Sequence, residues 1–207
     1  MLLKNGSSDA TPSPEDQSTP PPEVPAFSFK VAKADVVPTN DTSAKKLSNQ
    51  AQATAKSVGE TLSDMYRWAY LAPANWQSGS YDQVWNYYDS HSVSDAKSNV
   101  DTLTLGSQAG DTFSSVEPGS GNVQVQVLMD DHNKPTSALA TVKFSAKAAG
   151  KDGSTTVVNS TGDYFLRPAG SKWVIYSFKV SRKDHSKKSA PASIGGGSPS
   201  AKPTETP

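Results

Sequence analysis

Residues 44–72, AKKLSNQAQATAKSVGETLSDMYRWAYLA, decide the fold of this 207-residue chain. Side chains of apolar character recur at spacings of three and four along the stretch: Leu47, Ala51, Ala55, Val58, Leu62, Met65, Ala69 and Ala72. This spacing places them in one stripe of an α-helix. Residues 40–43 offer N-cap side chains before the stretch, and Pro73 ends it. We therefore predict one helix over 44–72, with a bend at Gly59 and an alanine-rich first half that projects or frays.

Two shorter helices are predicted directly after the long one. Residues 80–88, SYDQVWNYY, begin with a capping serine and place Tyr81, Val84, Trp85 and Tyr88 on one helical face. Residues 92–105, SVSDAKSNVDTLTL, form a weaker pattern that ends at Gly106, a residue typical of helix C-termini.

The second half of the chain changes to the two-residue period of β-strands. Residues 122–129, NVQVQVLM, alternate valine with glutamine, and further strands are predicted at 136–148, 154–167 and 172–181. The turns between these strands are short, and strands joined by such turns pair antiparallel. A short strand is also predicted at 27–31, FSFKV.

These elements predict an α+β fold, in which one long and two short helices pack on a curved antiparallel sheet of about four strands. Such a sheet wrapped around the long helix forms a cone with one open end. The folded domain is expected at 39–183, because every aromatic residue lies between Phe27 and Phe178. Residues 1–38 are expected to be a disordered tether rich in serine, threonine and proline, and 184–207 a disordered tail.

The composition excludes several classes of function. Twenty basic residues balance twenty acidic ones, and only three of the basic residues are arginine, which argues against a nucleic-acid partner. The absence of cysteine excludes disulfides and thiolate metal sites. No run is long and apolar enough to cross a bilayer, so membrane attachment is expected only through an anchor upstream of Met1. The tether composition predicts an exported protein, extracellular or attached to the cell surface.

The order of elements, together with the closing segment 162–176, GDYFLRPAGSKWVIY, resembles the nuclear transport factor two-like (SnoaL-like, cystatin-like) superfamily. In that superfamily the last hairpin often carries a glycine turn followed by tryptophan and an apolar strand. The resemblance covers residues 44–183, and its closest likeness is to exported or lipoprotein-type domains of actinobacterial envelopes. It implies either an enzyme such as an isomerase or dehydratase, or a domain without chemistry, because both occur on this fold.

An enzyme of this kind would need an acid or base inside the cone, where burial tunes its pKa. Asp89 and His91, which follow the predicted 80–88 helix, are the nearest approach to an acid–base pair. Asp163 is a third candidate, although its position beside Gly162 fits a bulge or an edge strand. We favour a structural role for all three and expect no catalytic residue.

The sequence predicts neither a metal site nor a cofactor. The run Asp130-Asp131-His132-Asn133 superficially suggests a calcium loop, but it lacks the glycine and the distal glutamate of that loop.

Aromatic residues form the other candidate site. Five of them, Tyr66, Tyr70, Trp85, Tyr88 and Trp173, are expected at the core and rim of the cone. In the alternative interpretation they line a pocket that binds an apolar ligand or stacks against sugar rings.

The function favoured by these observations is a non-enzymatic binding or assembly module of the cell envelope. The alternative is a small isomerase or dehydratase, or a protein with an apolar-ligand pocket. The expected partners are an envelope protein, a small apolar ligand or a second copy of the chain, because many members of the superfamily form homodimers through the open face of the sheet.

Overall fold

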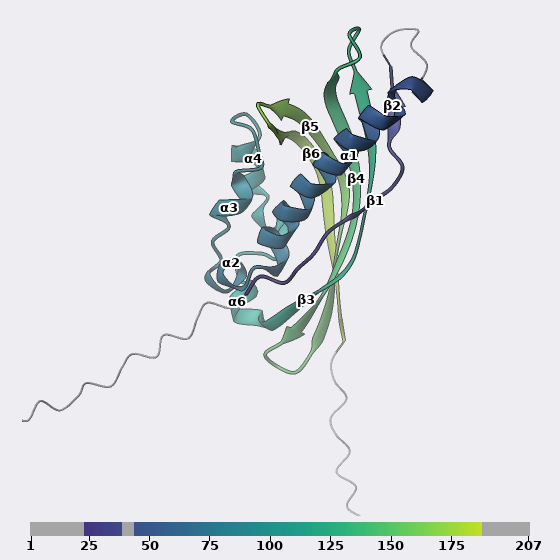
Figure 1. Ribbon diagram of the computed structural model, residues 1–207. Helices are drawn as coiled ribbons and strands as arrows, with labels where there is room; N and C mark the ends of the chain where they lie inside the picture. Colours follow the sequence, from purple (N-terminus) through teal and green to yellow (C-terminus); the bar gives the residue numbers. More distant parts are fainter. Residues whose placement is uncertain (1–22, 39–43, 188–207) are drawn as a thin grey trace, which may run out of the picture.

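The computed structural model describes residues 23–38 and 44–187. Within these ranges the helices lie on one face of a single sheet, which confirms the α+β class (Figure 1). The helical elements are α1 (Ala44–Tyr66), the π-helical turn η1 (Arg67–Leu71), α2 (Pro73–Ser78), α3 (Asp82–Trp85), α4 (Val93–Ser98), α5 (Val100–Leu103) and α6 (Ala109–Thr112). The strands are β1 (Lys30–Val31), β2 (Asp35–Val37), β3 (Phe113–Met129), β4 (Pro135–Gly150), β5 (Thr155–Ala169) and β6 (Lys172–Lys187). The predicted tails at 1–22 and 188–207, and the predicted helix cap, lie outside the described residues.

The sheet is open and mixed, with strand order β1-β3-β4-β5-β6 and β2 also paired to β3. The antiparallel pairing predicted for the four long strands is confirmed. The prediction of about four strands was too low, because β1 and β2 add to the edge of β3 in parallel orientation. The strand predicted at 27–31 overlaps β1 only at Lys30–Val31, and the parallel pairing of such short strands with the distant β3 leaves no recognisable pattern.

The segment before α1, assigned from its composition to a tether, packs on the domain. The ring of Phe29 is buried, and its ring centroid lies 5.0 Å from that of Tyr66. Gly59 of α1 permits this approach, since a Cβ atom there would lie 2.5 Å from Cγ2 of Val31. α1 runs through Gly59 without interruption, so the predicted bend is absent and the glycine serves close packing instead.

The first half of α1 is covered rather than projecting. Leu47 is 6% exposed, and Ala51 and Ala55 are completely buried. The contacts of α1 with β2 and β3 explain the difference, because the N-terminal segment widens the sheet beneath this part of the helix (Figure 1). The predicted end at Pro73 is confirmed, and this proline also opens α2, where its missing amide costs no hydrogen bond.

The long strands extend further than predicted. β3 begins at Phe113 rather than 122, and its early part contains a register shift between Pro118 and Gly121 that hides the alternation. β6 continues to Lys187, which pairs with Thr155, so it passes the expected domain end at 183. Its last residues are all polar, and their composition resembles that of a tail.

The short helices cover the remaining concave part of the sheet. α3 ends at Trp85 rather than 88, and Tyr88 forms a parallel bridge with Ile175 of β6 instead. The predicted 92–105 helix is divided into α4 and α5 at Asn99. α2 and α6 were not predicted. None of the helices within the described ranges has both the length and the apolar character needed to cross a bilayer.

Candidate functional site

The space between α1 and the sheet is filled by aromatic rings. Tyr66, Tyr70 and Tyr164 are completely buried, and the first two stack with ring centroids 5.2 Å apart. Phe144 lies 5.0 Å from the Tyr66 ring and 4.9 Å from the Tyr70 ring. These four residues form a tyrosine cluster in the place where the cone hypothesis put a hollow.

Hydrogen bonds satisfy most hydroxyl groups of the tyrosine cluster. The Tyr66 hydroxyl lies 2.9 Å from that of Ser160 and 3.1 Å from that of Tyr164. The Tyr70 hydroxyl donates to the carbonyl oxygen of Thr102 at 3.1 Å. Burial raises the pKa of Tyr66 to about 12, and it also raises the pKa of Tyr70 and Tyr164. The three phenols are therefore neutral hydrogen-bonding groups at physiological pH.

The other three predicted aromatic residues lie beside the tyrosine cluster or further out. Tyr88 is 6% exposed, with its ring centroid 5.7 Å from that of Phe178. Its hydroxyl is buried and has no hydrogen-bond partner among the described residues. Trp85 and Trp173 are half-buried at the margin of the core.

Replacing tyrosine by phenylalanine should distinguish a buried hydroxyl that has a hydrogen-bond partner from one that has none. We expect Tyr66→Phe to lower the free energy of unfolding by about 1–3 kcal/mol, because Ser160 and Tyr164 lose a buried partner. Tyr88→Phe removes a hydroxyl without a described partner, so its expected effect is close to zero or stabilising. Urea unfolding of both variants measures the difference, and an equally large loss in Tyr88→Phe would indicate a bound partner.

Asp89 and His91 do not form an acid–base pair. The Asp89 carboxylate accepts hydrogen bonds from the backbone amides of His91 and Ser92 at 3.0 and 2.9 Å, and Arg167 donates to it at 2.8 Å. Burial alone would raise the pKa of Asp89, but the hydrogen bonds from Ser92 and His91 and the charge of Arg167 outweigh it and lower the pKa. The His91 side chain is exposed, at 3.4 Å from the Ser90 hydroxyl. Asp89 therefore fixes the turn before α4.

This depressed pKa predicts how stability depends on pH. The stabilisation by the Asp89 carboxylate is complete above the pKa of an unfolded aspartate, about 3.9, and disappears as the pH falls through the lower folded value. Asp89→Asn should lower the free energy of unfolding at neutral pH by about 1 kcal/mol, and the gap to the unaltered protein should close in acid. Urea titrations at several pH values would show this, and a gap independent of pH would contradict it.

Asp163 lies on the outer face of the sheet, away from the tyrosine cluster. Its carboxylate accepts a hydrogen bond from the Thr141 hydroxyl at 2.7 Å. The predicted bulge or edge position is wrong, since β5 is an inner strand and its register shift with β6 lies between Phe165 and Leu166. The three candidate catalytic residues are thus not brought together, and each carboxylate has a structural partner.

A large cleft lies elsewhere, where the helices stop short of the β4–β5 turn. It encloses about 1130 Å³ between the loop 104–112 and the end of β6. Most of its lining residues carry a hydroxyl or carboxylate group, including Asp101, Ser107, Thr112, Thr156, Asp184 and Ser186. Such walls suit a polar partner better than an apolar one.

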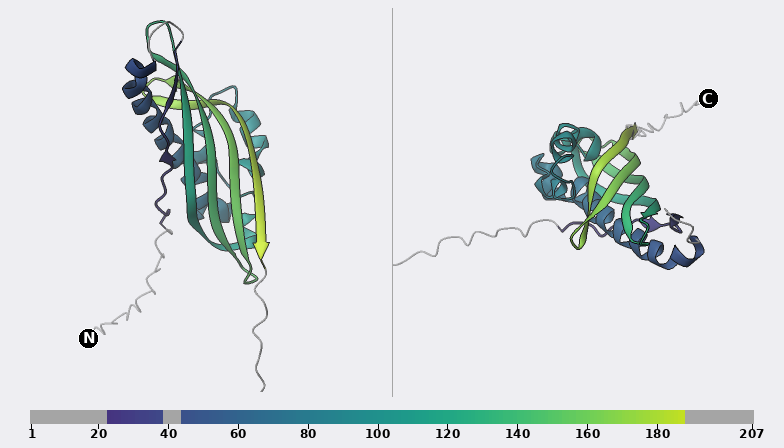
Figure 2. Two further views of the ribbon diagram at one scale, coloured as in Figure 1. Left: turned by 90° about the vertical axis from the view of Figure 1, so that its right-hand side faces the viewer. Right: turned by 90° about the horizontal axis from the view of Figure 1, so that it is seen from above.

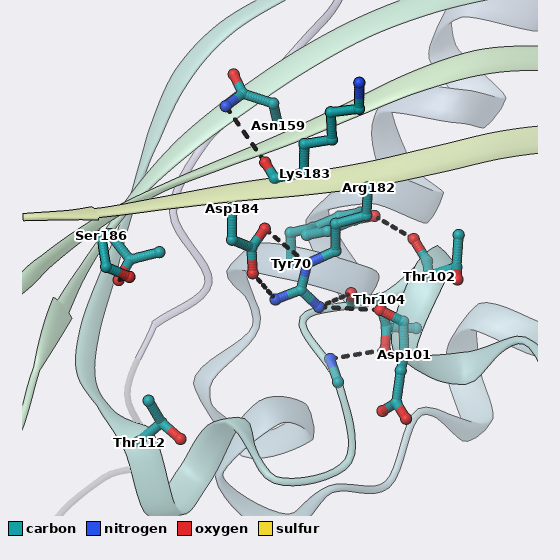
Figure 3. A network of polar contacts seen from close by, with 12 residues as sticks. Tyr70, Asp101, Thr102, Thr104, Thr112, Asn159, Arg182, Lys183, Asp184 and Ser186 are labelled. Carbon is teal, nitrogen blue, oxygen red and sulfur yellow. Dashed lines mark hydrogen bonds and ion pairs between the residues drawn. The ribbon is translucent and has the colours of Figure 1, made fainter.

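Arg182 joins the two sides of this cleft (Figure 3). Its guanidinium donates to both carboxylate oxygens of Asp184 and to the carbonyl oxygens of Asp101 and Thr104, at 3.1 and 2.8 Å for the carbonyls. The Arg182 side chain is only 14% exposed. Because all three of its nitrogen atoms donate to these groups, Arg182 holds the loop to β6 rather than offering a charge to a ligand.

The sequence interpretation missed this cleft. Asp184 was assigned to the tail, and Arg182 lies just after the predicted strand 172–181, although residues two apart share one face of a strand. The continued alternation Val180, Arg182, Asp184, Ser186 was the available signal.

The loop between β3 and β4 brings Asp130, Asp131 and His132 together, with possible metal-ligating atoms within 4.8 Å of one another. The Asp130 carboxylate already accepts hydrogen bonds from the backbone amides of His132 and Lys134. The Asp131 carboxylate pairs with the His132 ring at 2.6 Å. These contacts explain why the three side chains lie together: they stabilise the turn between β3 and β4.

No protein-family model matches the sequence, and no curated protein matches it.

Proposed function

We propose that this chain is a binding or assembly module of the cell envelope, without enzymatic activity, on a nuclear transport factor two-like fold. The observation that carries the proposal is the tyrosine cluster, which occupies the place where enzymes of that superfamily hold an acid or base. The fully buried polar residues in the described ranges are threonines, serines and an asparagine. The most shielded carboxylate among the ion pairs there, Asp89, is 8% exposed and paired with Arg167.

The polar cleft is the preferred binding surface of the module. Its hydroxyl and carboxylate groups favour a polar partner such as an envelope protein. The location at the envelope is inferred from the serine, threonine and proline content of residues 1–26, which is typical of spacers. The serine- and glycine-rich residues 188–207 have the same character.

One observation favours the alternative of an apolar-ligand pocket. The Tyr88 hydroxyl is buried among aromatic rings without a described partner, and a ligand oxygen would satisfy it.

An NMR titration of the full chain with naphthol distinguishes these functions. A module with a filled interior should show no saturable shift changes at Tyr66, Ser160 and Tyr164. Saturable changes at those residues would favour the pocket or the enzyme. Fractionation of cells that produce the tagged protein from its own gene tests the location, and recovery in the cytoplasm alone would contradict the envelope proposal.

Assembly into a homodimer is the second part of this proposal. An apolar row crosses the outer face of the sheet near the β3–β4 hairpin, where Val37 pairs with Leu128 and Leu139 pairs with Phe165. Val37, Leu128 and the neighbouring Tyr176 are 45%, 41% and 38% exposed. Exposed apolar groups in a row favour contact with another protein surface.

Sedimentation equilibrium of the full chain tests this contact. We expect a dimer that Leu128→Glu dissociates, whereas Val157→Glu should leave it intact, since Val157 is equally exposed but lies outside the apolar row. A monomer at all concentrations would contradict the dimer and leave the NMR result unaffected.

A further inference from the structure

The half of the outer sheet face away from the β3–β4 hairpin carries a regular arrangement of lysines. Lys143 and Lys147 lie on β4, and Lys179, Lys183 and Lys187 lie on β6. Between them β5 presents the uncharged residues Thr155, Val157, Asn159 and Thr161. We propose that this surface, the lysine track, binds a linear phosphate polymer that lies along β5. The inference goes beyond the proposed function, because it requires neither a cleft ligand nor export.

Strand register places the lysines on both sides of β5. Lys143 is opposite Thr161, and Lys147 is opposite Val157. Asn159 is opposite Lys183, and Thr155 is opposite Lys187. Positions four apart on a strand are about 13 Å apart, and strands separated by one neighbour are about 10 Å apart. The lysine track therefore consists of two rows of lysines, about 10 Å apart, that run parallel to the strands on either side of β5.

The track faces solvent. All five lysines are exposed, and no helix covers this face of the sheet (Figure 2). Figure 3 shows Lys183 and Asn159 on the opposite side of β6 from Arg182 and Asp184, which point toward the helices. The same strand thus builds the polar cleft with one set of side chains and the lysine track with the other.

The charge of the track is not neutralised locally. Two carboxylates lie opposite these lysines, since Glu117 is opposite Lys147 and Asp163 is opposite Lys179. A third carboxylate of the outer face, that of Asp35 in β2, accepts a hydrogen bond from Gln124 beyond β4. The five lysines and the first two carboxylates give the track a net charge of +3, on a chain whose formal net charge is zero. Within the described residues no salt bridge within 4.0 Å involves any of the five lysines. A positive field of this kind attracts a polyanion.

The chemistry of the track favours phosphate groups. Lysine binds phosphate as a point charge, whereas planar carboxylates are best matched by the arginine fork. The three arginines are engaged with Asp64, Asp89 and Asp184 instead. The uncharged strand between the lysines supplies hydroxyl and amide groups for phosphate oxygens. It carries no aromatic side chain on which a nucleic-acid base could stack, so the expected polymer has no bases.

A hollow extends the track toward β1. It encloses about 290 Å³ and is lined by Lys30 and Lys143, with the polar side chains of Asn122, Gln124 and Thr141 between and beside them. The ammonium groups of these two lysines, rather than the largely apolar wall of the hollow, provide a further place for a phosphate group of the same polymer.

Binding of fluorescently labelled inorganic polyphosphate to the full chain tests the proposal. We expect saturable binding that weakens steeply as the salt concentration rises. The variant Lys143→Glu/Lys147→Glu/Lys183→Glu should bind about 100-fold more weakly, from the usual contribution of a lysine near an anionic surface. The matched control Lys45→Glu/Lys46→Glu/Lys56→Glu makes the same change of charge on α1 and should bind at least tenfold more tightly than the track variant.

Circular dichroism and the urea midpoint establish that both triple variants fold. Equal weakening in both variants would overturn the proposal, because net charge rather than the track would then determine binding. The proposal would also be overturned if phosphatidylglycerol vesicles or a single-stranded oligonucleotide bound more tightly than polyphosphate and lost that binding in the track variant. The ligand that binds more tightly would then be the occupant of the track. None of these outcomes bears on the naphthol titration or on cell fractionation.

Discussion

Arg182→Ala should lower the free energy of unfolding by about 3 kcal/mol, the largest loss we expect from removing any ion pair in the described part of the chain. Truncation leaves the Asp184 carboxylate and the carbonyl oxygens of Asp101 and Thr104 without their shared donor. The Arg182 side chain is 14% exposed and that of Asp184 is 32% exposed, so most of the expected cost comes from the lost charge-assisted hydrogen bonds to the two carbonyl oxygens and the carboxylate. Urea unfolding followed by circular dichroism measures the loss.

Arg167→Ala is the matched control for Arg182→Ala. Arg167 also pairs with one carboxylate, that of Asp89, but its side chain is 49% exposed. Arg167 donates a single hydrogen bond, and the shielded Asp89 carboxylate keeps its two backbone amide donors after truncation, so we expect a smaller loss of about 1 kcal/mol. In addition, the double variant Arg182→Ala/Asp184→Ala should be less destabilised than the sum of its single variants. Similar losses for both arginines, or strictly additive losses in the double variant, would show that the hydrogen bonds of Arg182 at the cleft contribute little to stability.

Gly162→Ala should also destabilise the protein by about 3 kcal/mol. Gly162 lies in the middle of β5 with a φ of 156°, and a Cβ atom there would be 2.3 Å from the carbonyl oxygen of Lys179. The obstacle is backbone of the neighbouring strand, so relief requires the β5–β6 pairing to shift. Hydrogen exchange of β6 amides should rise together with the loss measured in urea.

Gly170→Ala is the control for the cost of placing alanine at a positive φ without a steric clash. Its φ of 63° also favours glycine, but no atom lies within 4 Å of the added Cβ. The expected cost is about 1 kcal/mol. If both alanine variants lose the same amount, steric contact between β5 and β6 is not what requires glycine at position 162.

The parts of the fold that the sequence predicted are those with a strong local period. The apolar stripe of α1 and the alternation of Val123, Val125 and Val127 each identify an element, and short turns determine the antiparallel order. The predicted strand at 27–31 overlaps β1 only at its last two residues, and β2 was not predicted, because distant partners hold both strands. Phe29, for example, packs against Tyr66 of α1, and Gly59 of the same helix makes room for Val31.

The candidate site was harder to predict than the fold. Tyr66 and Tyr70 were correctly placed at the core, since large aromatic residues at helical spacing have few other positions. The polar cleft depends on which side chains of β6 face inward, and composition alone suggested a tail there. The lysine track likewise needs the pairing of three strands, which no single segment of sequence specifies.

The two borders of the sheet have different protection against unwanted pairing with other proteins. β1 and β2 shield β3, whereas β6, apart from its pairing with β5, is joined by backbone hydrogen bonds to other described residues only at Ile175, through Tyr87 and Asp89. Repulsion between the ammonium groups along β6 then keeps further chains from stacking against it. Removing these charges would leave β6 as an unprotected edge strand that can pair with another chain.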